Sequence, residues 1–153
     1  MATVEKSIEV GVPVHSAYNQ WTQFESFPEF MDGVKEVQQL DDTHLHWKAD
    51  INGKKEEWDA EITEQVPDRR IAWRSTTGAP NAGVVTFHPL DNSTTKVMLQ
   101  LEAEPQSATE KVGAAVGVLD RKVKSDLEKF KDFMESRGGQ PTGAWRGEVN
   151  RNS

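Results

Sequence analysis

A long amphipathic segment near the C-terminal end constrains the fold of this chain more than any other feature. Between Ala108 and Ser136 the apolar residues recur every three or four positions, which is the spacing of one helical stripe. The stripe consists of Val112, Val116, Leu119, Val123, Leu127, Phe130 and Met134. A helix of about 29 residues would be roughly 43 Å long. A stripe of that length needs a broad partner, so we expect the helix to lie across a curved sheet and to leave space there for an apolar small molecule.

The ends of this helix carry their own signals. Ser107 and Glu110 have the spacing of a capping box, and the Gly138-Gly139 pair is typical of a helix stop. The first half contains Gly113, Ala114, Ala115 and Gly117, and so has little side-chain bulk. Two interpretations stay open for that half, a thin flexible lid over a cavity mouth or close packing against other helices.

The residues before the helix predict a sheet. Val4, Ile8 and Val10 share one face of a first strand, and two short helical segments follow at Val14 to Trp21 and at about Glu25 to Phe30. Asn52-Gly53 favours a hairpin turn, and Gly78 to Gly83 is expected to be a loop. Six further strands are predicted: Val34–Leu40, Thr43–Ile51, Lys54–Val66, Arg69–Ser75, Val84–Leu90 and Lys96–Ala103.

Composition narrows the possible partners. The net charge of −7 disfavours nucleic acid, because binding to phosphates depends on clustered Lys and Arg. The chain contains no Cys, which excludes disulfides and thiolate chemistry and fits a reducing compartment, so we expect a cytoplasmic protein. The first ten residues do not resemble a signal peptide, and no apolar run is long enough for a transmembrane segment.

Few residues suggest catalysis or metal binding. His15, His44, His46 and His88 are scattered, and no two lie at a helical ligand spacing with a carboxylate nearby, so we expect neither a metal nor a cofactor. The acidic side chains of the predicted strand Lys54–Val66, namely Glu56, Glu57, Asp59 and Glu61, are interpreted as a solvated strand face. Alternation turns Arg74 away from its neighbours Trp73 and Ser75.

Two stretches carry a resemblance to a known family. The residues from Val12 to Val34, VPVHSAYNQWTQFESFPEFMDGV, and those from Pro67 to Ser75, PDRRIAWRS, followed by Asn81-Ala-Gly83, are similar to the polyketide cyclase/dehydrase branch of the START-like, or SRPBCC, superfamily. The resemblance implies an α+β helix-grip fold, with a seven-stranded curved antiparallel sheet around a long C-terminal helix and two short helices after the first strand. We expect one START-like domain over residues 1–137 and a flexible tail over residues 138–153, in which Trp145 could dock back or meet a partner.

The resemblance also directs the functional hypotheses. Members of the superfamily carry lipids, isoprenoids and polyketides, and aromatase/cyclases are thought to use a buried Arg with Tyr, Ser or Trp partners. The inward aromatic positions predict a wall for such a ligand. The predicted ligand-binding residues are Trp21, Phe27, Phe30, Trp47, Trp58, Trp73, Ser75, Phe87, Leu101, Val116 and Leu119. Binding of one hydrophobic small molecule is the leading hypothesis, a polyketide cyclase/dehydrase is the second, and a stress-related interaction protein is the third, whereas catalytic residues and oligomeric state stay unassigned.

Overall fold

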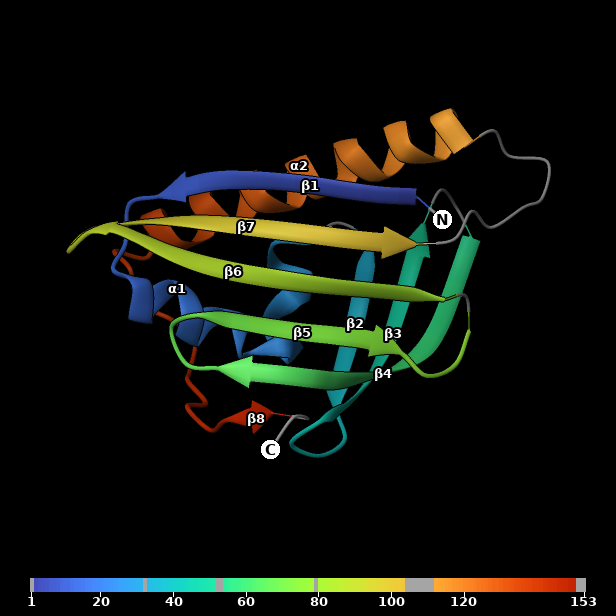
Figure 1. Ribbon diagram of the computed structural model, residues 1–153, viewed down its shortest axis with the longest axis horizontal. Helices are drawn as coiled ribbons and strands as arrows, with labels where there is room; N and C mark the ends of the chain where they lie inside the picture. The colour runs from blue at the N-terminus through green and yellow to red at the C-terminus, as the bar shows by residue number, and fades with distance from the viewer. Residues whose placement is uncertain (1, 32, 52–53, 79, 104–111, 151–153) are drawn as a thin grey trace.

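A curved antiparallel sheet and one long helix make up most of the molecule (Figure 1). The computed structural model describes residues 2–31, 33–51, 54–78, 80–103 and 112–150, with the backbone alone at residues 2, 51, 54, 103, 112–119 and 150. The elements in chain order are β1 (Ala2–Val10), α1 (Val14–Trp21), the 3₁₀ helix η1 (Phe24–Glu29), β2 (Val34–Gln39), β3 (His44–Ile51), β4 (Lys54–Val66), β5 (Arg70–Ser75), β6 (Asn81–Asp91), β7 (Thr94–Ala103), α2 (Val112–Ser136) and β8 (Val149–Asn150).

The strand order across the sheet is β1-β7-β6-β5-β4-β3-β2, with every neighbouring pair antiparallel. In Figure 1 the strands β1, β7, β6 and β5 run almost parallel to α2, whereas β2 and β3 cross that direction steeply, so the sheet curls. This arrangement confirms the predicted fold: seven strands, two short helices after the first strand and a long C-terminal helix. The sheet has one addition that the sequence did not predict, the two-residue β8 paired with β4.

Strand alternation separates an inner face from an outer face. On β4, Trp58, Ala60 and Ile62 point inward as predicted, and Ala60 and Ile62 are fully buried. A register shift between Ile62 and Glu64 then changes the parity, so that Gln65 becomes the next inward and buried residue. The bulge therefore places a polar amide on an otherwise apolar face.

The predicted loop from Gly78 to Gly83 was wrong in its second half. β6 begins at Asn81, three residues before the predicted strand, and Gly83 pairs with Trp73 of β5 and Leu101 of β7. A Cβ atom on Gly83 would lie 2.5 Å from Cζ2 of Trp73. This glycine belongs to a strand interior because the Trp73 ring occupies the space that a side chain would need.

The apolar stripe of α2 packs into the concave side of the sheet. Val123, Leu127, Phe130 and Met134 are all at least 98% buried, as the periodicity predicted. On the flank toward β1, Asp120 forms an ion pair of 3.1 Å with Lys6. The described part of the helix ends at Ser136, as predicted. The proposed capping residues Ser107 and Glu110, and the predicted Asn52-Gly53 turn, lie outside the described residues.

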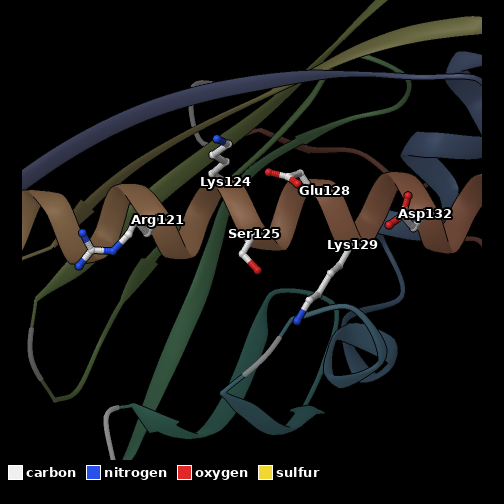
Figure 2. Close-up of a pocket in the computed structure, with 6 residues that line it drawn as sticks. All are labelled: Arg121, Lys124, Ser125, Glu128, Lys129 and Asp132. Atoms are coloured by element: carbon white, nitrogen blue, oxygen red, sulfur yellow. The ribbon is translucent and has the colours of Figure 1, made fainter.

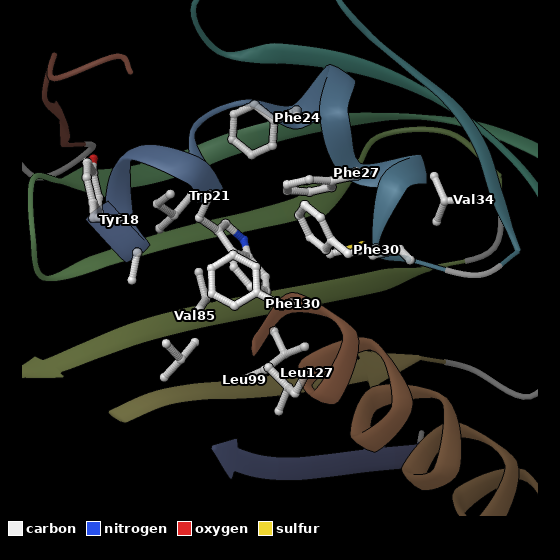
Figure 3. Close-up of a cluster of buried hydrophobic side chains, with 14 of the residues drawn as sticks. Tyr18, Trp21, Phe24, Phe27, Phe30, Val34, Val85, Leu99, Leu127 and Phe130 are labelled. Atoms are coloured by element: carbon white, nitrogen blue, oxygen red, sulfur yellow. The ribbon is translucent and has the colours of Figure 1, made fainter. Parts of the chain in front are cut away.

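Aromatic rings fill the space between the short helices and the second half of α2 (Figure 3). The Phe130 ring lies 5.0 Å from Trp21 and 5.3 Å from Phe30, both in edge or near-edge contacts. Phe27 bridges Phe30 and Trp47, with centroid distances of 5.5 and 5.6 Å. Such edge contacts add to the hydrophobic gain from burial, so this cluster fixes α2 on the sheet.

The C-terminal strap, which we define as residues 140–150, lies against α1 and the end of β4. The Thr142 backbone N–H donates to Gln20 Oε1 at 2.8 Å, and Trp145 N–H donates to Thr22 Oγ1 at 3.0 Å. The Arg146 guanidinium donates to both Asp68 carboxylate oxygens at 2.8 Å and lies over the Tyr18 ring. Of the two interpretations of the tail, a flexible end or a segment that docks back, these contacts correspond to the second, and the domain boundary at residue 137 stays a prediction. The partners of the strap are distant in the sequence.

Candidate ligand-binding site

The predicted ligand-binding residues separate into two groups. The first group is packed tightly into the core and lies between α1, η1, β6 and the second half of α2. Its members are Trp21, Phe27, Phe30 and Phe87, each at least 96% buried. The Trp21 ring lies 5.7 to 6.4 Å, centroid to centroid, from the other three rings in edge or tilted contacts, so the four rings act as the floor of the interior.

The second group lies on the inner face at the opposite end of the sheet, and we call it the aromatic end: Trp47, Trp58, Trp73, Ser75 and Leu101. Trp58, Trp73, Ser75 and Leu101 are only partly buried, although all four point inward. In Figure 1 this is the end where β5 and β7 finish, and the first turns of α2 extend toward it. The inner face is therefore closed at one end and partly open at the other.

Local sequence explains how the aromatic end is built. Trp47 and Trp58 are directly paired across β3 and β4, and their rings stack at 5.8 Å with an interplanar angle of 6°. Gly78 adopts a φ of +75° beside Trp58, a conformation that glycine tolerates best. On β6, Gly83 has no side chain, and the Trp73 and Leu101 side chains of the two neighbouring strands occupy the space beside it. Two glycines thus leave room for large rings on the inner face at this end of the sheet, where the rings form an apolar wall.

Two predicted residues, Val116 and Leu119, belong to the first turns of α2, and their side chains lie outside the part of the chain that the structure describes. The same holds for Gly113, Ala114, Ala115 and Gly117, so both interpretations of the thin helix half stay predictions. Ser75 uses its hydroxyl oxygen to accept a hydrogen bond of 3.0 Å from the Asn81 backbone N–H, which ties β5 to the start of β6.

Polar atoms without partners mark the interior near the aromatic end. Trp47 Nε1 and Asp126 Oδ1 are buried and have no hydrogen-bond partner among the described residues. Asp126 is 8% exposed, and its other oxygen accepts a hydrogen bond of 2.9 Å from Lys122 Nζ. Burial raises the pKa of the Asp126 carboxyl, whereas the Lys122 charge acts in the opposite direction. Sequence reasoning missed Asp126; its place beside the apolar stripe was the available signal.

A second set of buried polar groups lies at the closed end. Tyr18 Oη and the Gln65 amide are buried beneath the strap and form no hydrogen bond of ordinary geometry with described residues. Burial raises the pKa of the Tyr18 hydroxyl, and the nearby Gln65 amide and Arg146 charge reduce that effect. These groups are separated from the aromatic end by the packed rings and are not assigned to the site.

The charged side chains of the sheet lie mostly on its outer face. Arg74 points outward, as predicted, and its guanidinium lies 3.6 Å from Glu61. His46 forms a hydrogen bond of 2.6 Å with Asp59, which raises the pKa of the imidazole. Glu56 differs from the predicted solvated face because it shares the inward parity of Trp58 and is partly buried. All arginines between residues 2 and 150 that the structure describes are exposed.

Two other features, a metal centre and a membrane-spanning helix, are absent from the described ranges. No three His, Asp or Glu side chains in the described ranges gather closely enough to hold a metal ion. Among the helices that the structure describes, none is long and apolar enough to cross a membrane.

A shallow depression of about 350 Å³ on α2 is a separate feature (Figure 2). It is lined by Arg121, Lys124, Ser125, Glu128, Lys129 and Asp132. These residues follow one another around the side of the helix opposite the buried stripe, so the depression lies between charged side chains of a single element. We exclude it as a site for an apolar ligand.

A curled sheet that holds a long helix, with an inner aromatic wall, defines the START-like class of small α+β domains. Comparison with known proteins supports this assignment. Residues 10–132 match the family described as "Polyketide cyclase / dehydrase and lipid transport", and the chain belongs to that family. It is 60% identical over 150 residues to the "Uncharacterized 17.2 kDa protein in melC2-rnhH intergenic region" of Streptomyces lincolnensis, covering 97% of this chain and 99% of that protein.

Solved structures with low sequence identity share the fold. A START superfamily protein from Mycobacterium smegmatis superposes with a TM-score of 0.82 at 13% identity, covering 90% of this chain and 99% of that one. The Zhui aromatase/cyclase from Streptomyces sp. R1128 has a TM-score of 0.75 at 17% identity, covering 89% of this chain and 94% of that one. The family and its fold are therefore established on separate comparisons.

Proposed function

We propose that this protein binds one hydrophobic small molecule, of the polyketide, isoprenoid or lipid type, against the aromatic end of the inner face. The observation that carries the proposal is the partial exposure of inward-facing Trp58, Trp73 and Leu101 beside a floor of fully buried rings. Large apolar side chains that point inward and stay accessible leave surface that a flat or chain-like ligand can cover. The family description, which includes lipid transport, supports this class of ligand.

The alternative activity, cyclisation or dehydration of a polyketide, ranks second. The family description and the aromatase/cyclase fold neighbour support it. In this chain Arg74 is turned to the outer face, where it lies near Glu61, and Ser75 is engaged with Asn81. The described residues therefore favour ligand holding over the Arg-centred catalysis that the resemblance implied.

Binding of the neutral fluorescent probe N-phenyl-1-naphthylamine tests the proposal. We expect saturable binding with one site per chain, and at least tenfold weaker binding for Trp58→Ala and Trp73→Ala, because each substitution removes a large part of the apolar wall. Trp145→Phe, in the strap, is the matched control and should bind like the wild type. Absence of saturable binding, or equal affinity in all four proteins, would refute the proposed site.

Native mass spectrometry gives an independent measure. Protein purified from its own source is expected to retain an apolar molecule of defined mass, and Trp73→Ala should retain less of it. A wild-type spectrum with the mass of the bare chain alone, together with no probe binding, would contradict a carrier role.

A further inference from the structure

We infer that the ligand of the aromatic end is not purely apolar: it carries a hydroxyl or amine hydrogen-bond donor, and Asp126 of α2 accepts that hydrogen bond. This inference rests on the proposed function and adds a specificity-determining residue to it. The unusual feature is a carboxylate oxygen, Asp126 Oδ1, that is buried and has no partner among the described residues. A buried acceptor without a partner is costly, so such an atom in a ligand-binding region indicates a group that binds there.

The position of Asp126 follows from the contacts of α2. Asp126 precedes Phe130 by one turn and Phe133 by two turns, so the three side chains lie on one flank of the helix. Both phenylalanines pack on Phe30, the residue directly after η1, at centroid distances of 5.3 and 5.4 Å. Asp120, in contrast, pairs with Lys6 of β1 on the other flank. Asp126 therefore faces the interior on the side of η1 and β3, away from β1.

Asp126 lies near the end of the buried stretch of α2, whose first buried residue in the described part of the helix is Val123. Phe130, one turn later, is fully buried in the aromatic cluster (Figure 3), and α2 begins at the end of the sheet where β5 and β7 finish (Figure 1). On the sheet, the equivalent boundary is Trp47, which contacts the core through Phe27 and stacks on the partly exposed Trp58. Asp126 on the helix and Trp47 on the sheet thus border the same region.

Trp47 offers a second polar atom at this boundary. Its indole Nε1–H is buried, and no described atom accepts its hydrogen bond. A ligand oxygen near this boundary can accept from Trp47 Nε1, while a hydroxyl proton is donated to Asp126 Oδ1. The Lys122 ammonium holds the other carboxylate oxygen at 2.9 Å, which orients the acceptor and favours its charged form. The chemical class expected is an apolar skeleton with a phenolic or alcoholic hydroxyl.

The test compares two probes of nearly equal shape, 2-naphthol and 2-methoxynaphthalene, by displacement of N-phenyl-1-naphthylamine. Both carry an oxygen acceptor, but only 2-naphthol carries an O–H donor. We expect the wild type to bind 2-naphthol about tenfold more tightly, which is the usual size of one hydrogen bond to a charged acceptor. Asp126→Leu should abolish the difference between the probes, and Trp47→Phe should weaken both probes to a similar extent.

Controls separate this inference from its foundation. Asp132→Asn, on the exposed side of α2, should retain the tenfold preference. If Asp126→Leu fails to fold, Asp126→Asn is measured, and the neutral amide acceptor should reduce the preference to about threefold. Equal binding of both probes by the wild type, or an unchanged preference in the Asp126 variants, overturns the role of Asp126 while the apolar site stands. Failure of all naphthalene probes to bind overturns the proposed function itself.

Discussion

At the scale of single residues, contacts on the outer face raise the pKa of His46. His46 lies between Asp59 and Glu57, with its ring nitrogens 2.6 and 3.4 Å from carboxylate oxygens. The hydrogen bond to Asp59 is the largest cause of the raised pKa of His46, and the bond to Glu57 adds to it. The protonated imidazole therefore stabilises the pairing of β3 and β4.

The sign of the pH dependence follows from this raised pKa. Because the folded state binds the proton more tightly than the unfolded chain, the contribution is complete below the ordinary His pKa of 6.5. It is lost as the pH rises through the folded-state pKa. We expect the free energy of unfolding of the wild type to exceed that of His46→Gln at about pH 6, and this difference to shrink by about pH 8.5. Urea unfolding of both proteins measures it, and a difference that grows with pH would contradict the assignment.

Gly83 is the residue at which the smallest substitution should have a large effect. Its missing side chain accommodates the Trp73 ring, and an added Cβ would lie 2.5 Å from that ring. We expect Gly83→Ala to destabilise the fold by about 1–3 kcal/mol and to change the near-ultraviolet circular dichroism, because the ring must move. Gly11→Ala, which meets only the flexible end of Glu135, is the control and should cost less. Equal unfolding midpoints for the two variants would show that the Trp73 ring can move away from an added Cβ atom at little cost.

At the level of elements, the aromatic cluster determines how firmly α2 is held. Phe130 is fully buried and contacts rings from both α1 and η1. Phe130→Ala should therefore lower the free energy of unfolding by about 3–5 kcal/mol, which combines lost burial with an unfilled cavity. Glu128→Ala, two residues earlier and exposed, is expected to change stability by less than about 0.5 kcal/mol. Chemical denaturation of both variants tests the contrast.

The strap is the other element whose contribution can be measured directly. Deleting residues 140–153 removes the hydrogen bonds to Gln20 and Thr22 and uncovers Tyr18. We expect a loss of about 1–3 kcal/mol, because several partly buried polar groups lose their partners at once. Deleting residues 151–153 alone leaves every described contact in place and serves as the control. An unchanged melting temperature after the longer deletion would mean that the strap adds nothing to stability.

Elements with a strong period were predictable, and those set by distant contacts were not. The stripe from Val123 to Met134 and the alternation of β4 both follow from one buried face, which a sequence displays directly. β6 began earlier than predicted. Gly83 resembles a turn residue in the sequence, but in the structure it makes room for the Trp73 ring on the neighbouring strand β5. β8 depends on pairing with Gln65, far away in the chain. Asp126 was missed because its burial comes from tertiary packing rather than from its neighbours in sequence.

At the level of the whole molecule, the inner face changes from closed to partly open along the helix. Trp21, at the closed end, is 1% exposed, whereas Trp58 and Trp73 are partly accessible. We expect acrylamide to quench the fluorescence of Trp58 and Trp73 but not that of Trp21, measured in variants that each retain one tryptophan. A saturating apolar ligand should protect the first two. Similar quenching of all three would contradict the gradient on which the proposed site depends.

The short β8 strand has a consequence for how the molecule behaves in concentrated solution. β3 pairs with β4 only as far as Glu61, and β8 covers the backbone of Glu64 and Gln65 beyond that point. Without β8, these peptide groups would be a bare edge of the kind that recruits strands from other copies. The C-terminal residues thus also protect this strand edge against aggregation. A purification tag is therefore better placed at the N-terminus, where it does not disturb β8.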